Sequence, residues 1–349
     1  MSLTYVRFAD VNLADPFFDS LKADYAEFGQ WFAKKADNLA YLSRNENGAI
    51  DGFLYLKLED ENHRDIVPPL EAKQRMKVGT FKIDAHGTKL GERFIKKLFD
   101  HAMNAHVKEV YVTIFDKHVG LLKLLTRYGF KKWGTKASPN GTELVLVRTL
   151  KWQGSSLHEN YPLVKANAGD KYLLALFPQW HTRLLPDSQL INEGPNVVAD
   201  ISHANSIPKI YLAGRSGAQT LKHGDAVVIY RTSDNQGPAF YRSVATSVCV
   251  VDKVEMIQDY GTEDAFLEYC VPFSVFTEAE LKGLYKTKQY PVIITFTYNI
   301  SFPKRITRKA LIEEVGLDAK ARWTCLQITD NQFKEILSKG QVDESFIVD

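Results

Sequence analysis

Hydrophobic and polar positions change their spacing several times along the first 150 residues. Short apolar runs bounded by turn residues indicate strands, and aromatic side chains at helical spacing indicate a helix whose stripe faces the core. An alternating stretch around Asn45–Gly48 is typical of a hairpin. The pattern predicts a mixed α/β layer of strands over 3–11, 40–44, 50–60, 75–84, 108–115 and 142–150, with helices over 16–36, about 90–106 and 119–129.

The pattern of apolar and polar residues changes in the second half of the chain. Residues 151–171 are polar and lack a steady period, so we expect a linker there between domains at 1–150 and 172–349. Short apolar runs dominate beyond it, and runs at this spacing favour a mostly β domain closed into a small barrel. The expected strands are 209–214, 225–233, 240–257 and 290–302, and the expected helices are 277–286 and 329–337.

Composition narrows the classes of partner and compartment. The 349 residues are 45% hydrophobic and 25% charged, the balance of a soluble globular chain of two domains. Because 44 Lys and Arg are nearly balanced by 42 Asp and Glu, the net charge of the chain is too small to drive nonspecific binding to nucleic acid or membranes. Three scattered cysteines predict neither disulfides nor a metal site, and the apolar runs are too short to cross a membrane. A cytoplasmic protein is expected.

One stretch has the form of a phosphate-binding turn. "FKIDAHGTKLGERFIKKLF", residues 81–99, runs from a strand through a glycine-containing loop into an amphipathic helix. The free N–H groups and positive dipole end at such a helix start stabilise an anion whatever the side chains are. Gly87 and Gly91 permit a close approach, and Lys89 adds a charge. The alternative is a loop that only joins strand to helix.

The order of elements and this turn resemble the GNAT acetyltransferase superfamily, whose turn is Arg/Gln-x-x-Gly-x-Gly/Ala. Residues 86–91, "HGTKLG", stand at that turn, although only Gly91 matches a signature position, and Gly129-Phe130 matches the family's Gly-Phe helix end. The resemblance implies acetyl-CoA as the cofactor and transfer of an acetyl group to an amine. It also implies that the cofactor contacts the strand at Phe81 and Ile83, the turn at His86, Gly87, Thr88, Lys89, Leu90 and Gly91, and His118.

The same resemblance suggests catalytic residues. Glu59, at the end of the hairpin strand, would act as general base directly or through water, or be a solvated carboxylate. His118 would be catalytic, contact the cofactor, cap a helix or lie at the surface. The family's thiolate-protonating Tyr is replaced by Leu125, and Tyr128 is the nearest phenol.

Residues 208–251 resemble the PUA-like superfamily, including its ASCH and EVE branches, in the "KHGD" turn that leads to a strand ending in Tyr230-Arg231, and in "VATSV" after it. The resemblance implies binding of RNA or a modified base. The side chains expected to contact phosphate are Arg215, Arg231, Arg242, Lys304, Arg305 and Arg308, with Tyr211, Tyr230, Phe240 and Tyr241 available for stacking. The alternative is that the aromatics fill the barrel and the basic side chains form a solvated rim.

Two functions therefore stay open. The first is an acetyl-CoA-dependent N-acetyltransferase whose second domain recognises the acceptor, either RNA such as tRNA or a protein. The second is a scaffold that binds coenzyme A without transfer, joined to a nucleic-acid reader. No metal is expected in either.

Overall fold

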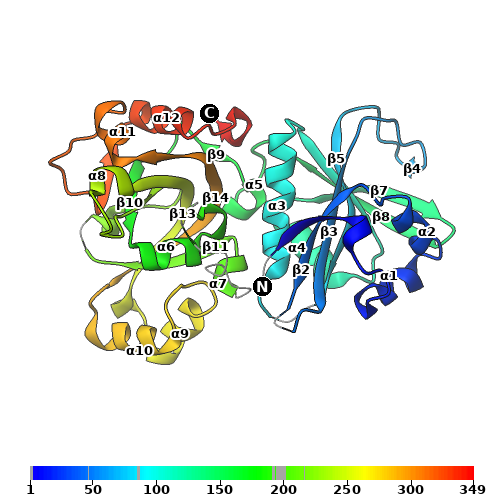
Figure 1. Ribbon diagram of the computed structural model, residues 1–349, viewed down its shortest axis with the longest axis horizontal. Helices are drawn as coiled ribbons and strands as arrows, with labels where there is room; N and C mark the ends of the chain where they lie inside the picture. Colours follow the sequence, from blue (N-terminus) through cyan, green and yellow to red (C-terminus); the bar gives the residue numbers. More distant parts are fainter. Residues whose placement is uncertain (1–2, 46, 85–86, 191–192, 194–201, 216) are drawn as a thin grey trace. The chain divides into compact units, whose positions relative to one another are not determined.

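The computed structural model describes residues 3–45, 47–84, 87–190, 193, 202–215 and 217–349 (Figure 1). They form two compact units, Met1–Gln153 and Gly154–Asp349. Most of the segment expected as a linker belongs instead to the second unit. It contains helix α5 (Leu157–Asn160) and strand β9 (Val164–Lys165), because Ser156 caps α5 and β9 pairs with β16 (Ile347–Val348).

The first unit is built on one mixed sheet of eight strands, in the order β1-β2-β3-β5-β6-β8-β7-β4. Its pairs are antiparallel except for β5 with β6. The strands are β1 (Thr4–Arg7), β2 (Leu39–Arg44), β3 (Ile50–Glu59), β4 (Ile66–Val67), β5 (Arg75–Ile83), β6 (Glu109–Ile114), β7 (Lys131–Ser138) and β8 (Gly141–Thr149).

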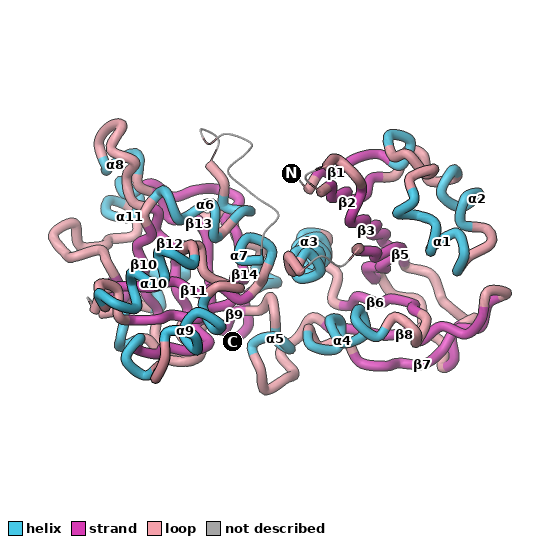
Figure 2. Tube along the Cα trace, turned by 90° about the horizontal axis from the view of Figure 1, so that it is seen from below, coloured by secondary structure: helices cyan, strands magenta, loops and turns pink. Residues whose placement is uncertain are grey.

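Helices cover both faces of this sheet. Helices α3 (Leu90–Asn104) and α4 (Val119–Arg127) lie on one face, and α1 (Asp19–Asp24) and α2 (Phe28–Ala33) lie on the other (Figure 2). The single helix expected over 16–36 is divided because the backbone becomes extended at Tyr25. The aromatic stripe nevertheless packs into the core as expected, with Phe18, Phe28 and Phe32 beside Phe8 and Phe53.

The second unit contains a six-stranded sheet in the order β11-β14-β13-β12-β10-β15. In the part of the chain that the structure describes, β11 and β15 do not pair with each other, so the sheet is open and the expected closed barrel is not formed. The strands are β10 (Lys171–Leu176), β11 (Pro208–Ala213), β12 (Ala226–Arg231), β13 (Val244–Met256), β14 (Val292–Thr307) and β15 (Cys325–Ile328).

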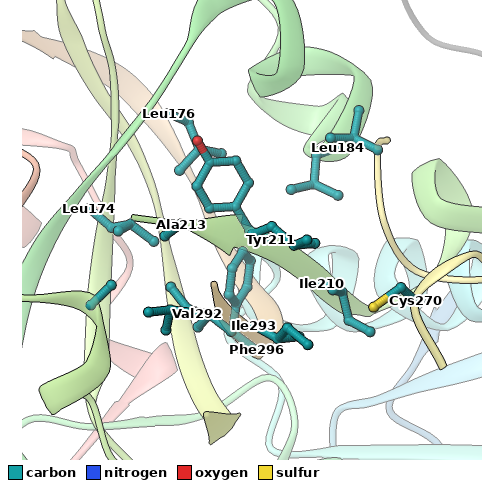
Figure 3. Packing of buried hydrophobic residues seen from close by; sticks show 14 of the residues in the cluster. Leu174, Leu176, Leu184, Ile210, Tyr211, Ala213, Cys270, Val292, Ile293 and Phe296 are labelled. Carbon is teal, nitrogen blue, oxygen red and sulfur yellow. The ribbon is translucent and has the colours of Figure 1, made fainter. Parts of the chain in front are cut away.

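Strands and helices of the second unit contribute to a core that includes Leu176, Tyr211 and Phe296 (Figure 3). The strand expected to begin at Phe240 starts later, because the residues after Pro238 form a helical turn, α8.

The helices of the second unit are α6 (Pro178–Leu184), α7 (Ser202–Asn205), α8 (Ala239–Arg242), α9 (Glu263–Cys270), α10 (Glu278–Thr287), α11 (Arg308–Glu313) and α12 (Asp330–Lys339). None of the described helices is both long and apolar enough to span a bilayer.

Candidate functional site

Strands β5 and β6 of the first unit are paired over only part of their length. The parallel pairing joins Met76–Val78 to Val110–Val112, whereas β5 continues to Ile83 and β6 to Ile114. Strand β6 stays paired with β8 as far as Ile114, so β6 follows β8 and separates from β5. The sheet therefore opens between its two central strands.

This opening leaves backbone groups of β5 without a strand partner on one side. Asp84 N–H donates to the carbonyl of Asp51 at 2.9 Å, and in an antiparallel ladder the residues that bond to a given neighbour alternate. Lys82 and Thr80 therefore point their amides toward β3, and Phe81 and Ile83 point theirs away from β3. Phe81 and Ile83 thus present N–H and C=O groups to the opening.

A β-bulge lies where the opening begins. Thr80 pairs with Tyr55 and Val78 pairs with Leu56, so Gly79 is an extra residue on β5. A Cβ atom at Gly79 would lie 2.6 Å from Cδ1 of Tyr55. That ring is buried and contacts Phe8 and Trp31. The sequence has glycine here because the Tyr55 ring occupies the space of a side chain.

This close contact gives a prediction for stability. We expect Gly79→Ala to lower the free energy of unfolding of the first unit by about 1–3 kcal/mol, because the added methyl group must displace a ring that is packed on its other sides. The matched control is Gly29→Ala in α2, where no atom lies within 4 Å, and it should leave the unit as stable or up to about 1 kcal/mol more stable. Chemical denaturation of both variants tests this, and equal stabilities would contradict the packing argument.

Helix α3 begins at the end of β5, beside the opening. Lys89 precedes its first residue in the left-handed conformation with φ 58°, and Gly87 has φ 82°. A Cβ at Gly91 would lie 2.8 Å from Cδ2 of Leu124 on α4, so Gly91 allows the two helices to pack closely. Gly91 was expected to allow a phosphate to approach the backbone closely, but the space beside it is occupied by the Leu124 side chain. His86 lies outside the described residues.

The start of α4 also faces the opening. His118 precedes α4, is 44% exposed, and places Nε2 3.3 Å from Oδ2 of Asp24. Tyr128, at the other end of α4, is completely buried and does not line the cleft described below. The catalytic role suggested for Tyr128 is therefore not supported by its position: the side chains of α4 that line the cleft are Val119, Leu121 and Leu124.

A cleft of about 1360 Å³ passes through this region, larger than the pockets of about 300–1,000 Å³ that hold drug-sized ligands. It brings together most of the residues that the sequence indicated for the cofactor and the base: Glu59, Phe81, Ile83, Gly87, Thr88, Lys89, Leu90, Gly91 and His118. It is also lined by residues of the α1–α2 segment, including Tyr25 and Trp31. The cleft thus has lining residues from helices on both faces of the sheet.

Glu59 lies in the cleft wall with its charge compensated. Its Oε1 is 2.9 Å from Lys57 Nζ and 3.7 Å from Lys77 Nζ, and its Oε2 accepts a hydrogen bond from Tyr111 and lies 3.2 Å from His63 Nε2. Burial alone would raise the pKa of Glu59, but the Tyr111 hydrogen bond and the two lysine charges outweigh burial and lower it. The carboxylate is therefore ionised and held by its neighbours.

A second buried carboxylate in the cleft was missed by sequence reasoning. Glu143 on β8 is 6% exposed, and its Oε1 accepts a hydrogen bond of 2.7 Å from the hydroxyl of Tyr25. Burial and this bond raise the pKa of Tyr25, which keeps its proton and acts as the donor. The sequence does contain a sign of this buried carboxylate: Glu143 is spaced by two from Val145 and Val147, so that it lies on the core-facing side of the strand.

Glu59, Glu61 and His63 lie close enough to hold a cation, with ligand atoms within 4.8 Å of one another. The ammonium of Lys57, however, already contacts both carboxylates, at 2.9 and 3.8 Å. A lysine thus supplies the positive charge that this group of residues requires.

In the second unit, most of the side chains expected to contact RNA are engaged within the protein. Arg231 is buried at 4% exposure beside Glu193, and Arg242 forms a bidentate pair with Asp234. Arg305 donates to backbone carbonyls and Arg308 stacks on Trp323 at 3.9 Å. Arg215 and Lys304 are exposed.

The aromatic side chains offered for stacking are likewise mostly internal. Tyr211 and Tyr230 are 5% and 3% exposed, which corrects the expectation that they are available to bases. Tyr241 is 58% exposed and packs edge to face against Phe240.

No protein-family model matches the sequence, and no curated protein is significantly similar to it. Solved structures of two kinds are similar to this chain. An ASCH protein from Zymomonas mobilis is 6% identical and has a TM-score of 0.33, over 48% of this chain and 94% of that one. The NatC complex bound to Gag peptide and CoA is 16% identical with a TM-score of 0.30, over 43% and 100% of the two chains. A GNAT-family acetyltransferase from Streptococcus agalactiae is 12% identical with a TM-score of 0.26, over 32% and 65%.

Both folds that the sequence resembles, the GNAT acetyltransferase and the ASCH domain, are thus represented among these structures. The identities and TM-scores are low, so the roles of individual residues rest on the geometry of this chain alone.

Proposed function

We propose that the first unit binds acetyl-CoA in its cleft and transfers the acetyl group to an amine. The observation that carries the proposal is the separation of β5 from β6 beside the start of α3. The pantetheine arm of coenzyme A contains amide groups, and an arm of this kind pairs with an unpaired strand edge such as the one at Phe81 and Ile83. The pyrophosphate fits the helix start at Leu90, where N–H groups and the helix dipole favour an anion.

The direct test uses the whole chain. Acetyl-CoA should raise its thermal unfolding temperature, and a panel of amines, namely free amino acids, polyamines and peptides, should contain an acceptor that releases free coenzyme A thiol. No stabilisation by acetyl-CoA would contradict the proposal for the cleft.

One observation favours a second candidate, a unit that binds coenzyme A without transfer. The α4 side chains that line the cleft include no phenol to protonate a departing thiolate. Stabilisation by acetyl-CoA with no thiol release for any amine would support this second candidate.

For the second unit we propose recognition of the molecule that carries the acceptor amine, with RNA as the expected class. The exposed cations Arg215 and Lys304 support this proposal, since phosphate contacts need accessible charge. We expect the full chain to retard tRNA at low salt, and the double variant Arg215→Glu and Lys304→Glu to weaken that binding by about fivefold or more. Lys282→Glu, which reverses a partly exposed charge that pairs with Glu278 on α10, is the control. No retardation of tRNA would favour a protein acceptor.

A further inference from the structure

Two buried carboxylates line the cleft on one face of the sheet. Glu143 shares a strand face with Val145 and Val147, which cluster with Tyr111, and Tyr111 donates a hydrogen bond to Glu59. Glu143 itself is bonded to Tyr25, the residue that follows α1. Because α1 and α3 lie on opposite faces of the sheet, this part of the cleft lies on the side away from the α3 start (Figure 2).

The two carboxylates differ in what surrounds them. Each oxygen of Glu59 lies within 4.0 Å of two donors, from Lys57, Lys77, Tyr111 and His63. Its charge is balanced by the protein before any ligand arrives.

Within the described part of the chain, Glu143 has no such direct contact with a cation. Among the described residues, no Lys, Arg or His side chain lies within 4.0 Å of its oxygens, and Tyr25 is its hydrogen-bond donor. Lys136 is the residue paired with Glu143 on β7, but its Nζ forms an ion pair with Oδ2 of Asp65 at 2.7 Å. A carboxylate at 6% exposure with one neutral donor is costly unless a cation joins it. Because Glu143 lines the cleft, a cationic group of a ligand that enters the cleft can reach it.

The position of Glu143 is also close to where the strands part. Lys77, in the last stretch over which β5 and β6 are paired, is near enough to Glu143 to be influenced by its charge. An acceptor held by Glu143 would therefore lie near the vertex of the opening, where the end of an arm lying along β5 would also lie.

We propose that Glu143 receives the ammonium group of the acetyl acceptor and takes its proton, and that Tyr25 is a positioning residue that fixes the Glu143 carboxylate. This inference rests on the proposed function and adds the acceptor class, a primary amine that arrives charged. The ammonium gives its first proton to Glu143, and its nitrogen forms the new C–N bond as the C–S bond of the thioester breaks. The second proton goes to the departing sulfur, so that the products are the amide and the free thiol, and Glu143 releases its proton to water.

The first experiment needs no knowledge of the acceptor. Two coenzyme A thioethers are compared by calorimetry, one ending in a short aminoalkyl group and one in an alkyl group of the same length. The wild-type chain should bind the ammonium form about tenfold or more tightly than the alkyl form. Glu143→Gln should abolish this preference and leave the affinity for the alkyl form unchanged. Tyr25→Phe should reduce the preference only in part.

Glu59→Gln is the matched control, because it removes the other carboxylate of the same cleft, and it should keep the preference. Loss of the preference in Glu59→Gln but not in Glu143→Gln would overturn the assignment. Failure of both thioethers to bind would count against the proposed function itself and is distinguishable from the other outcomes.

The second experiment follows the proton. With an amine acceptor from the panel, Glu143→Gln should lower kcat/KM by about 100-fold or more at pH 7. The variant should recover about tenfold per pH unit between pH 7 and 9, because its substrate must lose the proton in solution. A merely structural role would lower activity equally at every pH, and that result would contradict the proposal.

Discussion

A carboxylate introduced at Gly87 should weaken the binding of acetyl-CoA by about tenfold or more. Gly87 lines the cleft beside the start of α3, and no atom lies within 4 Å of the position that a Cβ would take. The Asp side chain in Gly87→Asp therefore has room, and its charge would stand where the proposed site holds phosphates. Two like charges 4 Å apart repel by about 1 kcal/mol in water and about 4 kcal/mol near a protein surface.

The control for this variant is Gly87→Asn. Gly87 has φ 82°, a conformation in which any side chain is strained but which Asn and Asp tolerate better than most residues. The two variants have the same shape and nearly the same strain and differ in charge. Calorimetric titration with acetyl-CoA should show the large loss for Asp and at most a few-fold loss for Asn. Equal losses would mean that no phosphate lies near Gly87.

Acidification should destabilise the second unit well above the pH at which carboxylates titrate. His181 is completely buried, its ring nitrogens face the hydroxyls of Thr182 and Thr246, and burial with the charges of Arg231 and Arg305 lowers its pKa to about 3. In the unfolded chain the same imidazole titrates near its ordinary 6.5. Between these values the unfolded state binds a proton that the folded state does not bind, so stability is full above pH 6.5 and falls as the pH drops.

The expected loss from His181 is about 2 kcal/mol between pH 6.5 and 5, at about 1.4 kcal/mol per pH unit. Urea denaturation of the full chain at several pH values measures it. His181→Gln should be less stable at pH 7 but should lose less stability on acidification, because Gln does not titrate. The same pH dependence in wild type and variant would show that the pKa of His181 is the same in the folded and unfolded chain, which would contradict this account.

The sequence predicted the elements whose apolar period is strong. Most strands of the first unit and helices α3 and α4 lie close to their expected places, because each has a clear core face. Strand β7, "KKWGTKAS", was missed because it is largely polar and exposed, and its pairing with β8 and β4 decides its structure. The closed barrel was expected from strand spacing, but spacing carries no information on whether the end strands β11 and β15 meet.

The site was predictable where backbone chemistry decides it and not where side chains from distant segments meet. The run from Phe81 through Gly91 was recognisable because a strand, a glycine turn and a helix start follow one another in the chain. The pair of Tyr25 and Glu143 joins residues 118 positions apart, so no local pattern indicates it. Arg231 was expected to contact phosphate from the PUA-like resemblance, but in the fold it is buried beside Glu193, which is uncommon for a basic residue and is not indicated by any local pattern.

The central claim is that the arm of acetyl-CoA lies along the open edge of β5, and amide hydrogen exchange at single-residue resolution tests it most directly. In the chain without ligand, the N–H groups of Lys82 and Thr80 should exchange slowly because they face β3, and those of Phe81 and Ile83 should exchange faster. Saturating acetyl-CoA should slow exchange at Phe81 and Ile83 selectively. Unchanged exchange at these two amides, in a sample that binds acetyl-CoA, would contradict the account.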